Sequence, residues 1–425
     1  MKKTIFISIL SGVEAKDILR TNIVQILLQD PDVCVVLFLK STERAELYKK
    51  EFGHERIIFE VVRNYKPPRF NGFFEWLRFY LLRTQTLYLH KKIIFLEERN
   101  ILKFFLSVTL SFVLGRKLVR ALVRVLDFKL TKDDNFSEFF AKYNPKIVFL
   151  ANLFDGMEIS LLKKAKSGGV KSIGFINSWD KITSRGFVRT NPDKLIVPNE
   201  IVRKEAMKFM DFQHRDIFVS GVPQYDNYIN GKIWSREEFF KKCGIDPSKE
   251  LILFAPMGKV FGESNDWPTI DLICDFINKN KFDKKAELWV RFPPNDFTDQ
   301  RELKKRPFLR YTLPGTRFET TRGMDWDMSF EELDFLRNTL YHSSLIVGYG
   351  SSLGIDAAVF DKPVICINFL MAEIGSQKSN PLLRYNTNHY QNALRTGGIR
   401  MVKSKEELEL WINNYLNNSA IDRNE

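Results

Sequence analysis

Short runs of apolar and β-branched residues alternate with helical patterns along most of the chain. In the first half, such runs cover residues 4–10, 33–39, 57–62, 146–151, 171–177 and 194–198. Helical patterns separate several of them, at residues 15–28, 42–52 and 158–166. Strands that alternate with helices pair in parallel through crossover connections, so this half is predicted to form a doubly wound α/β domain.

The same alternation begins again after Gly221-Val222-Pro223. Strands are predicted over residues 250–255, 286–292, 344–349 and 363–369, and helices over 269–278, 329–341 and 353–360. A chain of 425 residues also exceeds what one hydrophobic core normally serves. We therefore expect an N-terminal domain over residues 1–220, a C-terminal domain over residues 221–405, and a closing helix and tail over residues 406–425. In such open sheets, ligands bind outside the carboxyl ends of the strands.

A basic and aromatic segment over residues 62–130 interrupts the first domain as a helical insertion. It holds fourteen Lys or Arg against four acids, and thus supplies +10 of the formal net charge of +13, together with thirteen aromatic residues. Its longest apolar run, over residues 104–114, is shorter than the about twenty residues that cross a bilayer. The insertion is therefore not predicted to span a membrane.

Two interpretations of this insertion compete. Its helices could cover a sheet, with the aromatic residues in the core and the basic residues in solvent. They could instead dock on anionic lipid head groups or on a lipid-linked acceptor. Nucleic-acid binding is a weaker third possibility, and we expect no nucleic-acid partner. The apolar run over residues 4–10 is short for a signal peptide, so we expect a cytoplasmic protein, peripheral at the inner face of the cell membrane.

Cysteine and histidine show no metal-binding pattern. The four cysteines are far apart in the sequence, and none of the five histidines belongs to a cluster with ligand spacing. We expect neither a disulfide framework nor a metal, and no cofactor.

Small residues follow the strand predicted over residues 344–349. The sequence Gly350-Ser351-Ser352-Leu353-Gly354-Ile355-Asp356 opens a helix there. Small residues let backbone amides approach a phosphate, hydroxyls can donate, and a helix N-terminus favours negative charge. This turn is predicted to bind a phosphate or diphosphate, and the alternative is ordinary capping by Ser351 or Ser352.

Two further strand ends of the second domain are candidates for anion binding. The strand over residues 250–255 runs into Pro256-Met257-Gly258-Lys259, whose backbone amides and lysine could hold a phosphate. The strand over residues 286–292 ends in Arg291-Phe292-Pro293-Pro294, and Arg291 could form a forked contact with a phosphate. The alternatives are a routine turn at the first and a proline-terminated strand end at the second.

Carboxylates follow two strands of the first domain. Asp180 lies in the loop after residues 171–177, where it could deprotonate a hydroxyl while Trp179 stacks on a sugar face. The alternative is an Asx-turn at Asp180, with Trp179 in the core. Asp155 and Glu158 follow another strand and are further candidates for the base, although Asp155 could instead cap the next helix.

These loops together resemble the GT-B glycosyltransferases of bacterial surface polysaccharide synthesis. More distantly, they are similar to CDP-glycerol glycerophosphotransferases and UDP-GlcNAc 2-epimerases. The matching pieces lie between about residues 170 and 370, and are the loop Asn177-Ser178-Trp179-Asp180-Lys181-Ile182-Thr183-Ser184-Arg185-Gly186, the segment Ser220-Gly221-Val222-Pro223-Gln224-Tyr225-Asp226, and the turn from Gly350 to Ala358 with Asp361-Lys362-Pro363-Val364-Ile365 after it.

The resemblance implies a metal-independent glycosyltransferase of the GT-B fold, with two Rossmann-like domains that face a cleft. The C-terminal domain would bind the nucleotide-sugar donor through Pro256, Gly258, Lys259, Arg291, Gly350, Ser351, Ser352 and Asp356. The N-terminal domain would bind a glycan or lipid-linked acceptor through Gly12, Glu14, Arg20, Trp179, Thr183 and Arg185. In one departure, Phe292-Pro293 replaces the His-Pro pair of many relatives, so that Arg291 must substitute or the donor differs.

Other functions remain open at this point. A CDP-polyol phosphotransferase would use a cytidine donor. A nucleotide-sugar epimerase would need no acceptor and would leave the basic aromatic insertion unexplained. A non-catalytic adaptor with a degenerate GT-B fold would account for the missing histidine.

Overall fold

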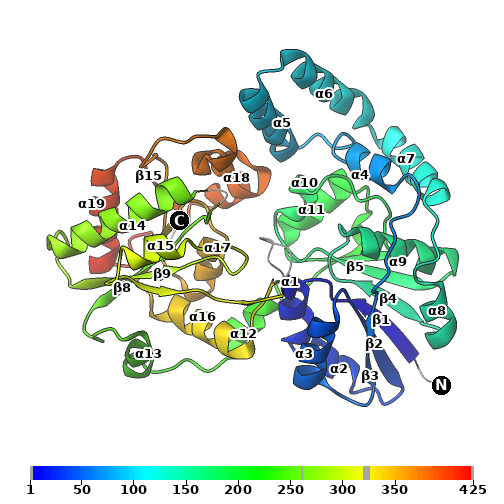
Figure 1. Ribbon diagram of the computed structural model, residues 1–425, viewed down its shortest axis with the longest axis horizontal. Coiled ribbons are helices and arrows are strands. Elements are labelled where there is room, and N and C mark those ends of the chain that lie inside the picture. Colours follow the sequence, from blue (N-terminus) through cyan, green and yellow to red (C-terminus); the bar gives the residue numbers. More distant parts are fainter. Residues whose placement is uncertain (1–2, 260–261, 319–325, 423–425) are drawn as a thin grey trace. The chain divides into compact units, whose positions relative to one another are not determined.

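The chain forms two compact units in the computed structural model, which describes residues 3–259, 262–318 and 326–422. Unit 1 covers Met1–Gln224 and unit 2 covers Tyr225–Glu425, so the division falls shortly after the predicted boundary at residue 220. Each unit is built around its own parallel sheet, with helices on the faces of that sheet (Figure 1). The predicted α/β class with two doubly wound sheets is confirmed.

The sheet of unit 1 has seven parallel strands in the order β3-β2-β1-β4-β5-β6-β7. The strands are β1 (Lys3–Ser8), β2 (Val33–Leu39), β3 (Ile57–Val61), β4 (Ile147–Leu150), β5 (Lys171–Phe175), β6 (Lys194–Val197) and β7 (Ile217–Val219). The strand order reverses between β1 and β4, so the carboxyl ends of these two strands form the topological switch point. The edge strand β7 was not predicted, because three residues are too few to show an alternating pattern.

The helices of unit 1 outside the insertion are α1 (Gly12–Glu14), the π-helical turn η1 (Ala15–Leu19), α2 (Ile23–Leu27), α3 (Thr42–Phe52), α8 (Ser137–Tyr143), α9 (Gly156–Ser167), α10 (Lys181–Ser184) and α11 (Glu200–Phe209). The single helix expected over residues 15–28 is wrong. Oγ1 of Thr21 donates to the carbonyls of Asp17 and Ile18 at 3.0 and 3.2 Å, and such bonds compete with the helical ladder. The helix is therefore interrupted before α2.

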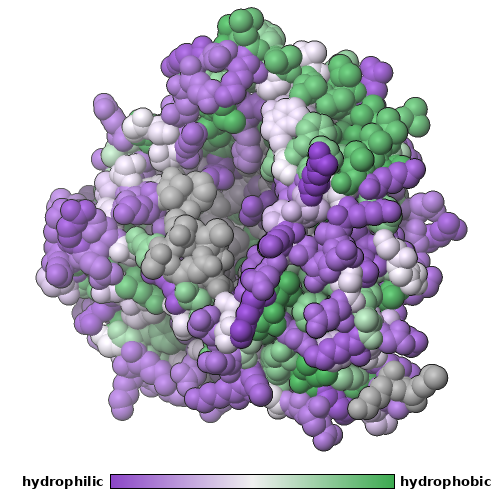
Figure 2. Space-filling model, turned by 45° about the vertical axis from the view of Figure 1, so that its right-hand side comes forward, coloured by the Kyte–Doolittle hydropathy of each residue, from purple (hydrophilic) through white to green (hydrophobic). Residues whose placement is uncertain are grey.

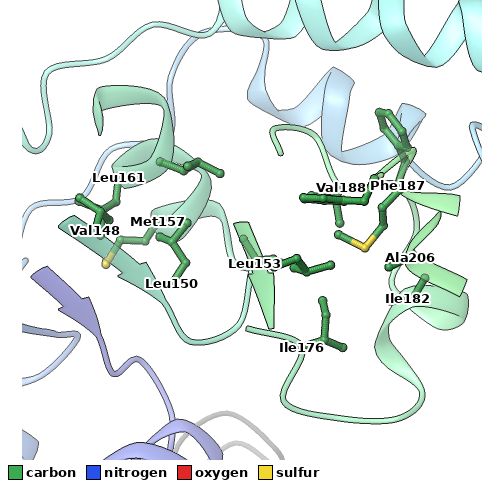
Figure 3. Close-up of a cluster of buried hydrophobic side chains, with 14 of the residues drawn as sticks. Val148, Leu150, Leu153, Met157, Leu161, Ile176, Ile182, Phe187, Val188 and Ala206 are labelled. Atoms are coloured by element: carbon green, nitrogen blue, oxygen red, sulfur yellow. The ribbon is translucent and has the colours of Figure 1, made fainter. Parts of the chain in front are cut away.

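Hydrophobic side chains fill both faces of the first sheet. Figure 3 shows part of one face, where Val148 and Leu150 of β4 lie beside Met157 and Leu161 of α9. Leu153 belongs to the same cluster and packs over Gly174 of β5, where an added Cβ would lie 2.4 Å from Cδ1 of Leu153. The close approach of Leu153 therefore requires glycine in this strand.

The insertion consists of four helices, α4 (Asn71–Leu77), α5 (Gln85–Glu98), α6 (Ile101–Leu114) and α7 (Lys117–Leu130). The helices α5 and α6 form a hairpin and lie side by side in Figure 1. Arg99 ends α5 in the left-handed region, with φ of 56°, and Oδ1 of Asn100 caps α6 by accepting from the amide of Lys103 at 2.9 Å. Within the described part of the chain, no helix is long and apolar enough to cross a membrane.

The sheet of unit 2 has six parallel strands in the order β10-β9-β8-β13-β14-β15. They are β8 (Glu250–Ala255), β9 (Ala286–Arg291), β10 (Arg310–Thr312), β13 (Leu345–Gly348), β14 (Val364–Ile367) and β15 (Arg400–Val402). The short antiparallel pair β11 (Thr316–Arg317) and β12 (Trp326–Asp327) stands apart from this sheet. Here the strand order reverses between β8 and β13.

The helices of unit 2 are α12 (Gln224–Asn230), α13 (Arg236–Cys243), α14 (Glu263–Asn278), α15 (Gln300–Lys304), α16 (Phe330–His342), α17 (Leu353–Ala357), α18 (Asn388–Leu394) and α19 (Lys405–Asn417). The sequence predicted a helix over residues 269–278 here. The helix in fact begins at Glu263 and includes Pro268. Buried Asn265 and Asp266 accept loop amides and so tie its first turn to the unit. The closing helix, predicted over residues 406–416, is α19.

Candidate functional site

Polar residues meet at the switch point of unit 1. Glu14 follows β1 and Asn152 follows β4, and Nδ2 of Asn152 donates to Oε1 of Glu14 at 2.9 Å. Oδ1 of Asn152 accepts from Nζ of Lys181 at 2.6 Å. Oε2 of the fully buried Glu14 accepts the amides of Leu10 and Ser11 at 2.5 and 2.6 Å. Segments that follow β1, β4 and β5 are thereby joined at one edge of the sheet.

Glu158 lies beneath this cluster and is only 1% exposed. Its Oε2 accepts the amides of Asn152 and Leu153 at 3.0 and 2.5 Å, and its Oε1 accepts from the hydroxyl of Ser8. Leu153 has a φ of 66°, which is rare for a residue with a side chain. The carboxylate therefore holds the strained turn after β4 in place.

The pKa values of the ionisable groups in this cluster are shifted from their usual values. Burial and, to a smaller extent, the nearby Glu14 raise the pKa of Glu158 to about 8. Burial also raises the pKa of Glu14, against the opposing effect of Lys181. The pKa of Lys181 is lowered by burial, although Glu14 acts to raise it. Perturbed groups of this kind are typical of functional sites, although buried structural networks also produce them.

The three candidate base carboxylates have different surroundings. Glu158 is buried, and both of its carboxylate oxygens accept hydrogen bonds. An acceptor hydroxyl could therefore not reach it. Asp155 caps α9 by accepting the amide of Met157 at 2.9 Å and pairs with Lys40 at 2.7 Å, which is the alternative role that the sequence allowed. Asp180 is half-buried, and accepts from Ser178 and, at 3.3 Å, from Ser184. Asp180 remains the candidate that a ligand could approach.

Asn177, in the loop that follows β5, was not singled out from the sequence. Its Nδ2 and Oδ1 atoms are both buried, and neither has a hydrogen-bond partner among the described residues. A buried amide without partners is costly, so such a group points to a ligand or a water molecule. Asn177 lies three residues before Asp180 in the same loop, and only the burial of its side chain distinguishes it from other loop asparagines.

The predicted acceptor contacts are not all at the surface. Trp179 is half-buried and Arg185 is exposed, as a ligand contact requires. Thr183 is buried, and its Oγ1 donates to the carbonyl of Asp180 at 3.2 Å, so it supports the loop from within. Gly12 is buried in α1. Arg20 is also buried.

Arg20 is a structural residue and not the acceptor contact that we expected. It is only slightly exposed, and its Nε and Nη2 donate to Glu51 of α3 at 3.2 and 2.8 Å. Its guanidinium also lies over the rings of Tyr48 and Phe52. This packing ties η1 to α3.

The turn after β13 is the candidate anion site of unit 2. Gly350 has a φ of 84°, and an added Cβ would lie 3.2 Å from the ring of Tyr390, so glycine is required. Oγ of Ser351 accepts the amide of Leu353 at 3.2 Å, whereas the side chain of Ser352 is exposed and makes no cap. Within the described part of the chain, the amides of Ser351 and Ser352 have no acceptor. Both amides are therefore free to donate to a ligand.

The helix that follows this turn is short. The helix α17 has five residues before it tightens into the 3-10 segment Ala358–Phe360. The dipole of so short a helix contributes little, so an anion at this turn would be bound mainly by the amides of Ser351 and Ser352. Asp356 within α17 accepts from the hydroxyl of the buried Tyr228 at 3.5 Å.

Arg291, at the carboxyl end of β9, is the most unusual cation of unit 2. It is 7% exposed, yet its guanidinium has no hydrogen bond or ion pair to any residue in the described ranges. Burial lowers its pKa to about 10, partly offset by Tyr228, Glu332 and Asp356. These three groups compensate the buried charge only in part, so an anion bound at this guanidinium would be favourable.

The turn Pro256-Met257-Gly258-Lys259 after β8 differs from the expectation. The amides of Met257 and Gly258 donate to Asp266 at 3.1 and 2.8 Å, and the amide of Lys259 donates to Asp296. These three amides are therefore not available to a phosphate. The side chain of Lys259 is exposed and remains a candidate.

The described residues contain no group of three or more His, Cys, Asp or Glu side chains that could hold a metal ion.

Solved structures share this architecture along nearly the whole chain. UDP-GlcNAc 2-epimerase from Neisseria meningitidis bound to UDP-GlcNAc is 9% identical, with a TM-score of 0.55, over 98% of this chain and 92% of that one. The enzyme of the same name from Methanocaldococcus jannaschii is 10% identical, with a TM-score of 0.52, over 100% and 94%. Arabidopsis thaliana UGT89C1 complexed with UDP is 12% identical, with a TM-score of 0.52, over 99% and 92%.

These similarities establish the GT-B fold, as predicted from the sequence, and at such low identity they establish the fold alone. No protein-family model matches the sequence, and no curated protein matches it either.

Proposed function

We propose that the protein is a glycosyltransferase that moves a sugar from a nucleoside-diphosphate donor to a hydroxyl of a glycan or lipid-linked acceptor. The observation that carries the proposal is the buried guanidinium of Arg291 in unit 2, which has no hydrogen bond or ion pair to a residue in the described ranges. The free amides of Ser351 and Ser352 follow β13 in the same sheet, so that the same edge offers a cation and two neutral donors. A diphosphate is recognised by this combination of groups.

The ligands of two structural neighbours support the same class of donor. The Neisseria meningitidis epimerase is bound to UDP-GlcNAc, and the Arabidopsis thaliana protein is complexed with UDP. For this chain we assign the nucleotide to unit 2 and the acceptor to unit 1, where the loop of Asn177, Trp179 and Asp180 follows β5.

The proposed reaction is a direct displacement at the anomeric carbon. The acceptor oxygen forms a bond to that carbon while the bond to the diphosphate oxygen breaks, and its electron pair leaves with the nucleoside diphosphate. Asp180 takes the proton of the acceptor hydroxyl. Arg291, the amides of Ser351 and Ser352, and Lys259 stabilise the charge that develops on the leaving diphosphate.

A nucleotide-sugar epimerase is the second candidate. The two UDP-GlcNAc 2-epimerases among the structural neighbours favour it, because they share the fold along nearly the whole chain. An epimerase would convert its nucleotide sugar without any acceptor, whereas a glycosyltransferase would release nucleotide in an acceptor-dependent manner. A CDP-polyol phosphotransferase would select cytidine nucleotides.

A thermal-unfolding screen with UDP, GDP, CDP, CMP and dTDP tests the proposal. A nucleotide at about one hundred times its dissociation constant stabilises the folded state by about 2.7 kcal/mol. We expect one nucleoside diphosphate to raise the unfolding temperature of the wild-type protein. The protein is then incubated with the matching nucleotide sugars, with and without candidate acceptors, and the released nucleotide is measured. If no nucleotide stabilises the protein, the proposal fails and a non-catalytic adaptor becomes the better account.

A further inference from the structure

The apolar stripes of two helices in the insertion face solvent. On α6 the exposed side chains recur at helical spacing and are Ile101, Leu102, Phe105, Leu106, Phe112 and Val113. On α7 they are Leu118, Leu122, Val125, Leu126 and Leu130. Leu102 is 79% and Leu118 is 85% exposed, whereas helices of globular proteins normally bury their apolar stripe. The interpretation that the insertion only covers a sheet is therefore wrong for these side chains.

Aromatic side chains extend the same surface. Phe70, Phe73, Trp76 and Phe79, in and beside α4, are each at least two-fifths exposed. In Figure 2 hydrophobic side chains gather in the upper part of the molecule, at the height where Figure 1 places α5, α6 and α7. Such a contiguous apolar surface marks a site of interaction.

Buried ion pairs fix which way α7 faces. Asp127, on its inner side, bonds to Arg189 at 2.7 and 2.8 Å and to Lys163 at 2.7 Å. Arg120 and Arg124 bond to Asp211, at 2.5 and 2.9 Å. Rotation of α7 to bury its leucines would leave these charges without partners, which is strongly unfavourable. The outward stripe is therefore held in place by the fold.

Charge identifies the occupant of this surface. The exposed charged residues of the insertion are ten basic ones, Arg63, Lys66, Arg69, Arg83, Lys92, Arg99, Lys103, Arg116, Lys117 and Lys129, and two acidic ones, Glu97 and Glu98. Glu98 pairs with Lys103 at 2.6 Å. A second copy of the chain would bring the same positive charge and be repelled, and nucleic acid would leave the apolar stripes unused. An anionic lipid bilayer matches both properties.

We propose that α4, α6 and α7 lie on the surface of an anionic lipid bilayer. The exposed apolar side chains enter the boundary between head groups and acyl chains, and the basic side chains contact lipid phosphates. None of these helices is long enough to cross the bilayer, so they lie in its plane. This surface is independent of nucleotide binding, and it would bring the proposed transferase to a lipid-linked acceptor.

Vesicle flotation tests this proposal, with phosphatidylcholine vesicles and with vesicles that also contain phosphatidylglycerol. We expect the wild-type protein to float with the anionic vesicles, and salt to weaken the binding. An apolar variant, Leu118→Ser/Leu122→Ser/Val125→Ser, and a charge variant, Arg116→Gln/Lys117→Gln/Lys129→Gln, should each bind about tenfold or more weakly. All six side chains are at the surface, so the fold should be retained.

A matched control removes three exposed lysines from unit 2, in the variant Lys241→Gln/Lys285→Gln/Lys304→Gln. It changes the net charge equally and should bind like the wild-type protein. The proposal is overturned if the wild-type protein does not float, or if the apolar variant floats equally well. It is also overturned if size-exclusion chromatography shows a wild-type dimer that the apolar variant loses, because the surface would then belong to a second copy. No nucleotide is present, so these outcomes are separate from the proposed transfer.

Discussion

Nδ2 of Asn152 donates a hydrogen bond of 2.9 Å to Oε1 of Glu14, and so joins the segments that follow β4 and β1. The same side chain accepts from Lys181, and it therefore links a buried carboxylate to a half-buried ammonium.

Replacement of Asn152 by alanine should destabilise the protein. Glu14 would lose one donor and Lys181 would lose the acceptor Oδ1 of Asn152, and a buried polar group left without a partner costs about 1–3 kcal/mol. Urea unfolding measures the effect. Asn64→Ala, at an exposed position, serves as the control and should be close to neutral. Equal stability of the two variants would show that the link is dispensable.

Glu158 should make the protein less stable as the pH rises. Its pKa is raised from 4.5 to about 8, so between these values the folded state holds a proton that the unfolded state has lost. This contribution to stability is fully present below pH 4.5 and is lost as the pH rises through about 8. Glu158→Gln keeps the acceptor for the amides of Asn152 and Leu153, and its stability should decline less over this range. Urea unfolding of both proteins near the two ends of this pH range gives the change in the free energy of unfolding with pH. Equal changes in the two proteins would contradict the raised pKa.

Removal of the charge at Arg291 should stabilise the unliganded protein. The guanidinium is buried without a partner in the described ranges, so Arg291→Met should raise the free energy of unfolding by about 1 kcal/mol or more. The matched control is Arg310→Met, at an exposed position on the neighbouring strand β10. Thermal unfolding without nucleotide compares the two variants. A destabilised Arg291→Met would mean that the guanidinium already has a partner within the protein.

Two substitutions of Ser352 separate the contribution of its backbone N–H from that of its hydroxyl. Ser352 has a φ of −61°, which proline also adopts, and its amide has no acceptor among the described residues. Ser352→Pro should therefore weaken nucleotide binding roughly tenfold, as expected for one hydrogen bond to a charged group. Ser352→Ala keeps the amide and should bind nearly as well as the wild-type protein. Titration calorimetry with the stabilising nucleotide distinguishes them, and equal affinities of the two variants would remove this amide from the site.

The sequence predicts the sheets well, because strands buried on both faces read as continuous apolar runs. Residues 33–39, 42–52 and 250–255 were expected with the bounds that β2, α3 and β8 have. The described strands that escaped this pattern have only two or three residues each, and are β7, β10, β11, β12 and β15.

Contacts between distant residues explain the errors at the site. The amides of Met257 and Gly258 donate to Asp266, and the guanidinium of Arg20 donates to Glu51. Neither carboxylate can be identified as a partner from sequence spacing alone. For α7 the sequence shows an apolar stripe, but it does not show whether this stripe faces the core or solvent. This orientation depends on Asp127 and its partners Lys163 and Arg189, which come from other parts of the chain.

Titration of the stabilising nucleoside diphosphate into the wild-type, Arg291→Met and Arg310→Met proteins tests the central claim most directly. Donor binding at Arg291 predicts that the wild-type and Arg310→Met proteins bind with similar affinity. Arg291→Met should bind at least about tenfold more weakly, because a charge-assisted contact is lost. Equal affinity of all three proteins, or no binding by the wild-type protein, would contradict the assignment of this edge of unit 2 as the donor site.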